Sequence, residues 1–241
     1  MEVYAYACAV TAAAASVLRR SAVELVGSAA LTAVVVGSGI AAVRLTDDAG
    51  IQLLVNSLAT AFGLFVLITV LAPLSGAHFN PVVTLADLAS GSRGVRDVAP
   101  YIAAQLLGCV AGSMLANLMF DLPPAAWSGT HRITPGHLLA EVVATAGLVF
   151  VVFALARTGR SHFAAAAVAT YIGAAYFFTS STSFANPAIT VGRMFTDTFA
   201  GIAPASAPLF IAMQLVGAAA GYLAVRLLVV ETPGRVGTAT G

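Results

Sequence analysis

The sequence has no lysine, and charged residues of all kinds make up only 9% of its 241 positions. Ordinary soluble domains carry about 25% charged residues, so this composition excludes a soluble globular protein. The formal net charge is only +1, which gives no indication of a nucleic-acid partner. Hydrophobic residues, by contrast, make up 59% of the chain. We therefore predict an all-α membrane protein that crosses the lipid bilayer several times.

Cysteine is also scarce. The two cysteines, Cys8 and Cys109, are isolated from each other, so the sequence predicts neither a disulfide framework nor a cysteine-ligated metal site. No nucleophile, base and orienting group cluster along the chain, and no set of residues has metal-ligand spacing. An enzyme, a bound metal and a bound cofactor are therefore not expected.

Six apolar stretches are long enough to cross a hydrocarbon core about 30 Å thick. An alanine-rich segment, residues 1–18, precedes the first of them. Because Arg19 and Arg20 follow this segment instead of leading it, it lacks the order of a secretory signal. We interpret it as an N-terminal extension that lies at the membrane interface. The predicted spans are 21–43, 51–72 (stopping at Pro73), 98–120, 138–156, 162–180 and 205–230, followed by a flexible polar tail, 231–241.

Two Asn-Pro pairs interrupt the apolar pattern, and each opens a short apolar run. Asparagine is a preferred helix N-cap, and proline suits the first helical position, where no N–H is needed. A run of ten residues makes a helix about 15 Å long, which is half of the hydrocarbon core. We therefore predict two re-entrant half-helices that together make one span. They are about 80–89, opening with Asn80-Pro81-Val82, and about 186–195, opening with Asn186-Pro187-Ala188.

The chain also contains an internal repeat. Residues 101–112 match residues 210–221 at seven of twelve positions. Each copy has three spans, an odd number, so the second copy must lie upside down in the membrane. Inverted repeats with broken helices at corresponding places mark a permeation site near the midplane. The copies cover about 19–120 and 136–230 of one domain, 19–230, and share the order Glu, Asn-Pro, Gln: Glu24, Asn80, Gln105, then Glu141, Asn186, Gln214.

The arginines predict an orientation. If the N-terminus is cytoplasmic, this topology puts eight of the eleven arginines on the cytoplasmic side. That distribution satisfies the positive-inside rule and makes both termini cytoplasmic. The three arginines on the outer side are Arg44, Arg132 and Arg193.

Together these features resemble the aquaporin, or major intrinsic protein, family. The resemblance covers about 20–230 and rests on the paired Glu, Asn-Pro and Gln residues and on the Ser-Gly-Ala-His-x-Asn-Pro loop that begins at Ser75. It implies six tilted helices and two half-helices around a pore, in a homotetramer with one pore per subunit. Val82 replaces the usual alanine of the first motif, which is a conservative change. More specifically, the chain resembles divergent bacterial members, some linked to arsenic resistance, which implies a bacterial cell membrane.

The buried polar residues of the repeat allow two interpretations. Ionisable groups at membrane depth are costly and usually functional, so Glu24 and Glu141 could relay protons in a transporter. The resemblance instead implies that they hold the re-entrant loops, with Gln105 and Gln214 as hydrogen-bond partners between helices. His78, near the inner mouth, is either a pH sensor or a hydrogen-bonded loop residue.

The selectivity filter is where the chain departs from its family. Most members have an arginine directly after the second Asn-Pro-Ala motif, and this chain has Ile189 there. The resemblance places the other filter positions at Phe62, at Ala174 or its neighbour Gly173, and at Ser183. These residues predict a wider and more apolar constriction, without the fixed cation.

Arg193 lies one helical turn beyond Ile189. It either stands in the outer vestibule, where it attracts anions, or pairs with Asp197 at i+4 and anchors the half-helix. Our main hypothesis is a passive channel for water and small neutral solutes, with polyols or metalloid hydroxides such as arsenous acid favoured by the wide filter. The alternatives are a proton-coupled transporter that uses Glu24 or Glu141, and a structural membrane protein with a closed pore.

Overall fold

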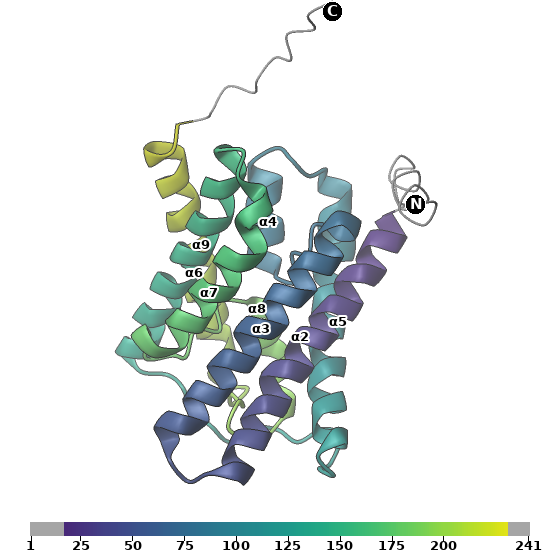
Figure 1. Ribbon diagram of the computed structural model, residues 1–241, viewed down its shortest axis with the longest axis vertical. Coiled ribbons are helices and arrows are strands. Elements are labelled where there is room, and N and C mark those ends of the chain that lie inside the picture. Colours follow the sequence, from purple (N-terminus) through teal and green to yellow (C-terminus); the bar gives the residue numbers. More distant parts are fainter. Residues whose placement is uncertain (1–16, 231–241) are drawn as a thin grey trace, which may run out of the picture.

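The computed structural model of the protein describes residues 17–230. Six long, tilted helices form a bundle, and two short helices lie within it (Figure 1). All six long segments are long and apolar enough to cross a membrane, so the predicted fold class is confirmed. The segments are α2 (Val17–Leu45), α3 (Ala49–Ser75), α5 (Val95–Met119), α6 (Pro135–Arg157), α7 (Ala164–Phe178) with the preceding 3-10 turn η2 (Ser161–Phe163), and α9 (Ala207–Leu228).

The predicted N-terminal extension and C-terminal tail lie outside the described residues, except that Val17 and Leu18 belong to α2. The prediction that Pro73 stops the second span is wrong. The helix continues through Pro73 to Ser75. A proline removes only one N–H donor, and α3 is closed instead by Gly76, whose φ of 96° lies in the left-handed region and whose N–H donates to the carbonyl of Ala72.

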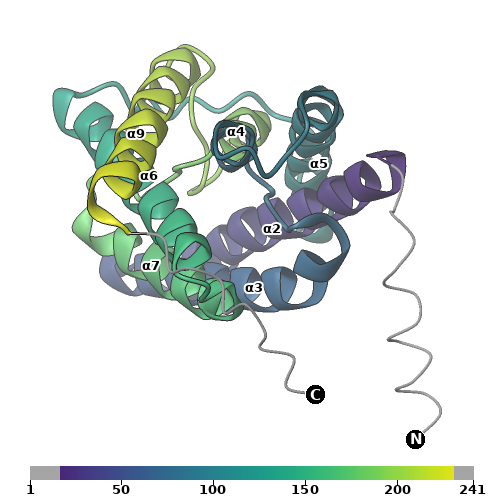
Figure 2. The same ribbon diagram turned by 90° about the horizontal axis from the view of Figure 1, so that it is seen from above.

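Both Asn-Pro pairs begin a short helix, as predicted. Asn80 caps α4 (Pro81–Ala89), and its side-chain oxygen accepts a bond from the N–H of Val82. Asn186 caps α8 (Pro187–Gly192) and accepts from two backbone N–H groups. The second half-helix tightens after Gly192 into the 3-10 turn η3 (Arg193–Phe195). Seen along the bundle, α4 lies between α5 and α9 (Figure 2).

The helix packing repeats itself. Helix α2 packs on α5 as α6 packs on α9, and α2 packs on α3 as α6 packs on α7. Small residues allow the first pair of contacts to be close. A methyl group on Gly112 of α5 would overlap the backbone carbonyl of Ala29 on α2, and one on Gly221 of α9 would overlap that of Ala146 on α6. Contacts between α3 and α7 join the two repeats.

The two ends of the bundle differ in charge. We call the end where α2 begins and α9 ends the basic end; the other is the opposite end (Figure 1). An ion pair of 2.6 Å between Arg20 and Asp97 ties the start of α2 to the start of α5 there. The described arginines divide as the sequence predicted: Arg19, Arg20, Arg93, Arg96, Arg157, Arg160 and Arg226 at the basic end, and Arg44, Arg132 and Arg193 towards the opposite end.

Candidate functional site

A cavity of about 190 Å³ lies at the centre of the bundle, and residues of both repeats line it. The start of each half-helix opens onto it through Asn80 and Asn186. Most of the remaining lining is aliphatic or aromatic, with polar groups towards the two ends. The aliphatic lining includes Leu31, Val35, Leu64, Ile68, Val83, Leu148, Val152, Val168, Ile172 and Ile189.

Each of the two asparagine side chains donates a hydrogen bond to a backbone carbonyl of the other repeat. The Nδ2 of Asn80 donates to the carbonyl of Ala185 at 2.8 Å, and the Nδ2 of Asn186 donates to the carbonyl of Phe79 at 2.7 Å. Each Nδ2 carries two hydrogens, so one donor of each amide stays available at the cavity. The asparagines therefore cap their helices, join the repeats and face the cavity at the same time.

Glu24 holds the first re-entrant loop from α2. Its Oε1 accepts bonds from the hydroxyl of Ser75 (2.6 Å) and the N–H of His78 (3.0 Å). Its Oε2 accepts from the N–H of Phe79 (2.7 Å) and from the amide of Gln105 (2.8 Å). The side chain is fully buried, so four donors, and not water, stabilise its charge.

Glu141 repeats this arrangement on α6. Its Oε1 accepts from the hydroxyl of Ser181 (2.6 Å) and the N–H of Phe184 (3.0 Å). Its Oε2 accepts from the N–H of Ala185 (2.9 Å) and the amide of Gln214 (2.6 Å). The two glutamates and two glutamines therefore form a mirrored pair of anchors, one for each loop.

The anchored loops contain unfavourable backbone conformations. Ala77 and Phe79 have φ of 50°, and Ser183 and Ala185 have φ of 51° and 46°. This left-handed region costs a residue other than glycine about 1–2 kcal/mol. The same turns aim successive backbone N–H groups at one carboxylate, so the hydrogen bonds to Glu24 and Glu141 offset the strain and fix the loops beside the cavity.

The structure corrects two of the predicted filter positions. Phe62 is 67% exposed on the outside of α3, and Ala174 is exposed on α7. Their places at the cavity are taken by Thr60 and Tyr176, whose hydroxyl groups lie 3.0 Å apart and which are both buried. Gly173 faces Ser57 and Ala61 of α3 instead of the cavity.

The other predicted filter residues do line the cavity. Ser183 lies in the second re-entrant loop, and Ile189 lies in the first turn of α8. Both are almost fully buried in the bundle. The structure therefore brings together Ser183, Ile189, Thr60 and Tyr176 on the half of the cavity nearer the opposite end.

Arg193 also lines the cavity, and of its two predicted roles the pair with Asp197 is wrong. The Nε of Arg193 donates to the carbonyl of Ala200, while Asp197 accepts a bond from the N–H of Gly129 at 3.0 Å. The turn η3 departs from α-helical geometry at Arg193, so the i+4 spacing no longer places the two side chains together. The Arg193 guanidinium instead lies 3.4 Å from the centre of the Phe184 ring.

A second arginine approaches the same ring from the loop before α6. The guanidinium of Arg132 lies 5.3 Å from the centre of the Phe184 ring, and it donates to the carbonyls of Gly201 and Phe199. Burial lowers the pKa of Arg132, and the charges of Glu141 and Tyr176 oppose this shift. Arginine nevertheless stays charged at neutral pH. This part of the molecule therefore holds one buried cation, Arg193, and one partly buried cation, Arg132.

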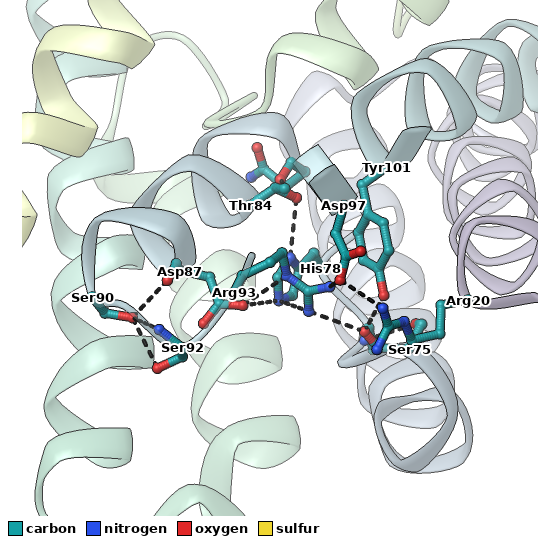
Figure 3. Close-up of polar contacts among 12 residues, drawn as sticks. Arg20, Ser75, His78, Thr84, Asp87, Ser90, Ser92, Arg93, Asp97 and Tyr101 are labelled. Carbon is teal, nitrogen blue, oxygen red and sulfur yellow. Dashed lines mark hydrogen bonds and ion pairs between the residues drawn. The ribbon is translucent and has the colours of Figure 1, made fainter. Parts of the chain in front are cut away.

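A network of polar side chains lies beside the cavity near the basic end, and Figure 3 shows its contacts. His78 and Asp87 line the cavity there. The Nε of Arg93 donates to Asp87 at 2.8 Å, and His78 lies 3.4 Å from the same carboxylate and 3.0 Å from the hydroxyl of Thr84. Of the two predicted roles of His78, that of a hydrogen-bonded loop residue agrees with these contacts.

The same network reaches the outer helices. The guanidinium of Arg93 lies 4.2 Å from the centre of the Tyr101 ring and 3.7 Å from Asp97, which also pairs with Arg20. Burial alone would lower the pKa of Arg93, but the neighbouring Tyr101 and Asp87 raise it above its ordinary value. The loop between α4 and α5 is thus fixed to α2 and α5 by charged groups.

The sequence analysis did not predict four residues that line the cavity or belong to the polar network: Thr60, Tyr176, Asp87 and Arg93. A hydroxyl or carboxylate inside an otherwise apolar segment was the available signal for the first three, because a polar group in a membrane helix normally faces the protein interior. Arg93 gave no such signal, because a basic residue in a polar loop is ordinary.

Comparisons with known proteins support a single family. Residues 11–185 match the family model described as major intrinsic protein. The chain is 48% identical over 210 residues to aquaglyceroporin AqpS of Rhizobium meliloti (strain 1021). The aligned region covers 87% of this chain and 90% of that protein. It is 31% identical over 184 residues to aquaporin A of Dictyostelium discoideum, and this aligned region covers 70% of this chain and 65% of that protein. Among solved structures, the aquaglyceroporin from Plasmodium falciparum matches with a TM-score of 0.68 at 21% sequence identity. The match covers 88% of this chain and 97% of that chain, which supports the fold.

Proposed function

Because this chain belongs to the major intrinsic protein family, we propose that it is a passive transmembrane channel for water and small neutral solutes. The observation that carries the proposal is the central cavity, which the starts of both half-helices face through Asn80 and Asn186. A channel of this kind needs a path between the repeats, and the cavity lies at that place.

The physics of the cavity favours neutral solutes. The two half-helices begin at the cavity, so their partial positive ends point at it and oppose cations. The free amide donors of Asn80 and Asn186 can bind the oxygen of a passing water or hydroxyl group. The apolar walls offer few groups that could replace the hydration shell of an ion, so ions are held back more strongly than neutral solutes.

Polyols and metalloid hydroxides such as arsenous acid are the solutes that we expect besides water. Ile189 occupies the position directly after the second Asn-Pro-Ala motif and lines the cavity with an aliphatic side chain. The relative with 48% identity is named an aquaglyceroporin, which agrees with a pore wide enough for a small polyol.

The contacts of the glutamates argue against a proton-coupled transporter. Glu24 and Glu141 each accept four hydrogen bonds, are fully buried, and are absent from the described cavity lining. A carboxylate that relays protons must lose and regain hydrogen bonds on each cycle, and here that would release a strained loop. A structural protein with a closed pore is the other alternative, and a flux measurement distinguishes it from a channel.

We further propose the bacterial cell membrane, cytoplasmic termini and a homotetramer. The grouping of arginines at the basic end supports the orientation. Large apolar side chains such as Leu54, Phe65 and Leu223 are exposed on the outside of the bundle, where lipid or a neighbouring subunit would cover them.

The test is stopped-flow light scattering on proteoliposomes exposed to an inward gradient of arsenous acid or glycerol. Shrinkage reports water leaving, and reswelling reports solute entering. Ile172→Trp places a large ring in the cavity, and the matched control Phe177→Trp changes a 52% exposed residue on the same helix. We expect Ile172→Trp to reduce both rates about tenfold or more, which corresponds to about 1.4 kcal/mol in the barrier, and Phe177→Trp to leave them unchanged.

The outcomes separate the hypotheses. Shrinkage and reswelling that Ile172→Trp blocks support a solute channel, and shrinkage without reswelling supports a water channel. A solute flux that saturates and follows a pH gradient would favour the transporter. Equal, lipid-like rates for all three proteins would favour the closed-pore protein.

A further inference from the structure

The family resemblance implies that this pore has no fixed cation in its filter, because Ile189 occupies the position where most members have an arginine. The structure nevertheless has a charged side chain at the cavity wall: Arg193 lines it and is only 3% exposed. It reaches the cavity from η3, one turn beyond Ile189.

The Arg193 side chain is held in a fixed position. Its Nε donates to the carbonyl of Ala200, and its guanidinium stacks on the Phe184 ring with 3.4 Å between the charged carbon and the ring centre. A cation over an aromatic face is stabilised by the ring's electrons. Phe184 is itself buried and its N–H is bound by Glu141, so the loop anchor also positions the ring that supports the guanidinium.

The charge of Arg193 is not neutralised by a carboxylate. Within residues 17–230, neither Arg193 nor the neighbouring Arg132 forms an ion pair with an acidic side chain. The hydrogen bond that holds the side chain uses the Nε of Arg193, on the stem side of the guanidinium. A buried guanidinium without an ion-pair partner, at a cavity wall, presents its charge to whatever enters.

Three residues with hydroxyl groups line the same cavity as Arg193. Ser183, Thr60 and Tyr176 supply hydroxyl groups to the same part of the cavity. A neutral solute that carries hydroxyl groups can accept hydrogen bonds from Arg193 and exchange others with these hydroxyls. A cation meets a fixed positive charge in a medium of low dielectric constant, where repulsion is strong.

We propose that Arg193 is the charge-selectivity residue of this pore, and that it excludes cations and orients neutral hydroxyl-bearing solutes from a position one turn beyond Ile189. The proposal rests on the proposed channel function. It assigns the filter to Thr60, Tyr176, Ser183 and Arg193, with Phe184 as the positioning residue.

The experiment uses the full-length protein in proteoliposomes, with water flux, sodium uptake and proton leak measured on the same preparations. Arg193→Met removes the guanidinium and its charge and keeps an unbranched side chain as far as the position of Nε. Arg193→Lys keeps the charge. The control Arg44→Met removes a charge at the same end of the bundle from an exposed residue that lies outside the described cavity lining.

We expect the Arg193→Met channel to conduct water and to leak sodium ions and protons about tenfold faster than the wild type or more. Arg193→Lys and Arg44→Met are expected to exclude cations as the wild type does. If Arg193→Met conducts no water, the same comparison is made with Arg193→Gln, whose amide can still donate to the Ala200 carbonyl.

A neutral variant that conducts water and still excludes cations would overturn the proposal while leaving the channel function intact. An equal leak in Arg44→Met would also overturn it, because the effect would then belong to the surface charge. A wild-type protein that conducts no water would overturn the channel function and this proposal together.

Discussion

At the scale of single residues, the two buried glutamates show how a carboxylate fixes a backbone that would not hold its shape alone. Each accepts two backbone N–H groups, a serine hydroxyl and a glutamine amide, in corresponding places of the two repeats. A glutamine side chain has one acceptor oxygen and an NH₂ group that cannot accept. If glutamine replaced the glutamate, its NH₂ group would therefore face the N–H and O–H donors that the lost carboxylate oxygen had accepted from.

We expect Glu24→Gln and Glu141→Gln each to lower stability by about 2–4 kcal/mol, because hydrogen bonds to a buried charged group are among the strongest in a protein. In a protein of this size that corresponds to roughly 5–15 °C in the midpoint of thermal unfolding. The measurement is unfolding in detergent, with Asp47→Asn, at an exposed carboxylate, as the control. Midpoints within a degree of the control would show that the carboxylate charges do not hold the loops.

At the scale of elements, the contact of α2 with α5 and that of α6 with α9 depend on glycine. Gly108 and Gly112 on α5 leave room for the carbonyls of Leu25 and Ala29, as Gly217 and Gly221 on α9 do for the facing helix. Without the hydrophobic effect between helices in lipid, such close backbone approach is a main source of helix association.

Gly112→Ala and Gly221→Ala are each expected to lower the free energy of unfolding by about 1–3 kcal/mol, as overpacking does. The added methyl group must push apart two backbones, and no side chain can move away to admit it. Thermal unfolding in detergent measures the loss. Gly94→Ala is the matched control, because a Cβ there meets nothing within 4 Å and should change stability by less than about 0.5 kcal/mol. Unchanged midpoints in both core variants would contradict the packing argument.

The elements also show what the sequence could and could not predict. The half-helices were predictable because an Asn-Pro pair is typical of a helix start. The cost of a glutamate in lipid marked Glu24 and Glu141 as important, but their role as loop anchors was implied only by the family resemblance. The filter residues on α3 and α7 were not, because an apolar helix in a membrane is apolar on both its lipid face and its protein face. Phe62 and Ala174 were therefore assigned to the wrong face, and the hydroxyls of Thr60 and Tyr176 were the better markers. Of the two roles predicted for Arg193, the pair with Asp197 was wrong because it assumed α-helical spacing across a 3-10 turn.

At the scale of the whole molecule, the basic end and the opposite end define an axis through the membrane. Seven described arginines gather at the basic end, and the network of Arg20, Asp97, Arg93 and Asp87 ties several of its elements together (Figure 3). We expect this end to face the cytoplasm.

Thiol labelling in intact bacteria tests the orientation. In a Cys8→Ser background, Ser161→Cys places a thiol on an exposed residue at the basic end, and Leu45→Cys places one on a 77% exposed residue at the opposite end. Cys109 is buried and should stay unlabelled. A membrane-impermeant reagent should label Leu45→Cys from outside and reach Ser161→Cys only after the cells are opened. The reverse pattern would invert the topology.

The hydrogen bonds that each asparagine donates to the backbone of the other repeat have a consequence for the order in which the protein is made. Every bond to Glu24 comes from the first half of the chain, so the first re-entrant loop can be anchored while the second half is still on the ribosome. Asn80, however, donates to Ala185, and Asn186 donates to Phe79. The wall of the cavity is therefore completed only after the second half has been translated and inserted. A chain that stops early contains an anchored loop but no conduit, so the membrane is not breached while the protein is being built.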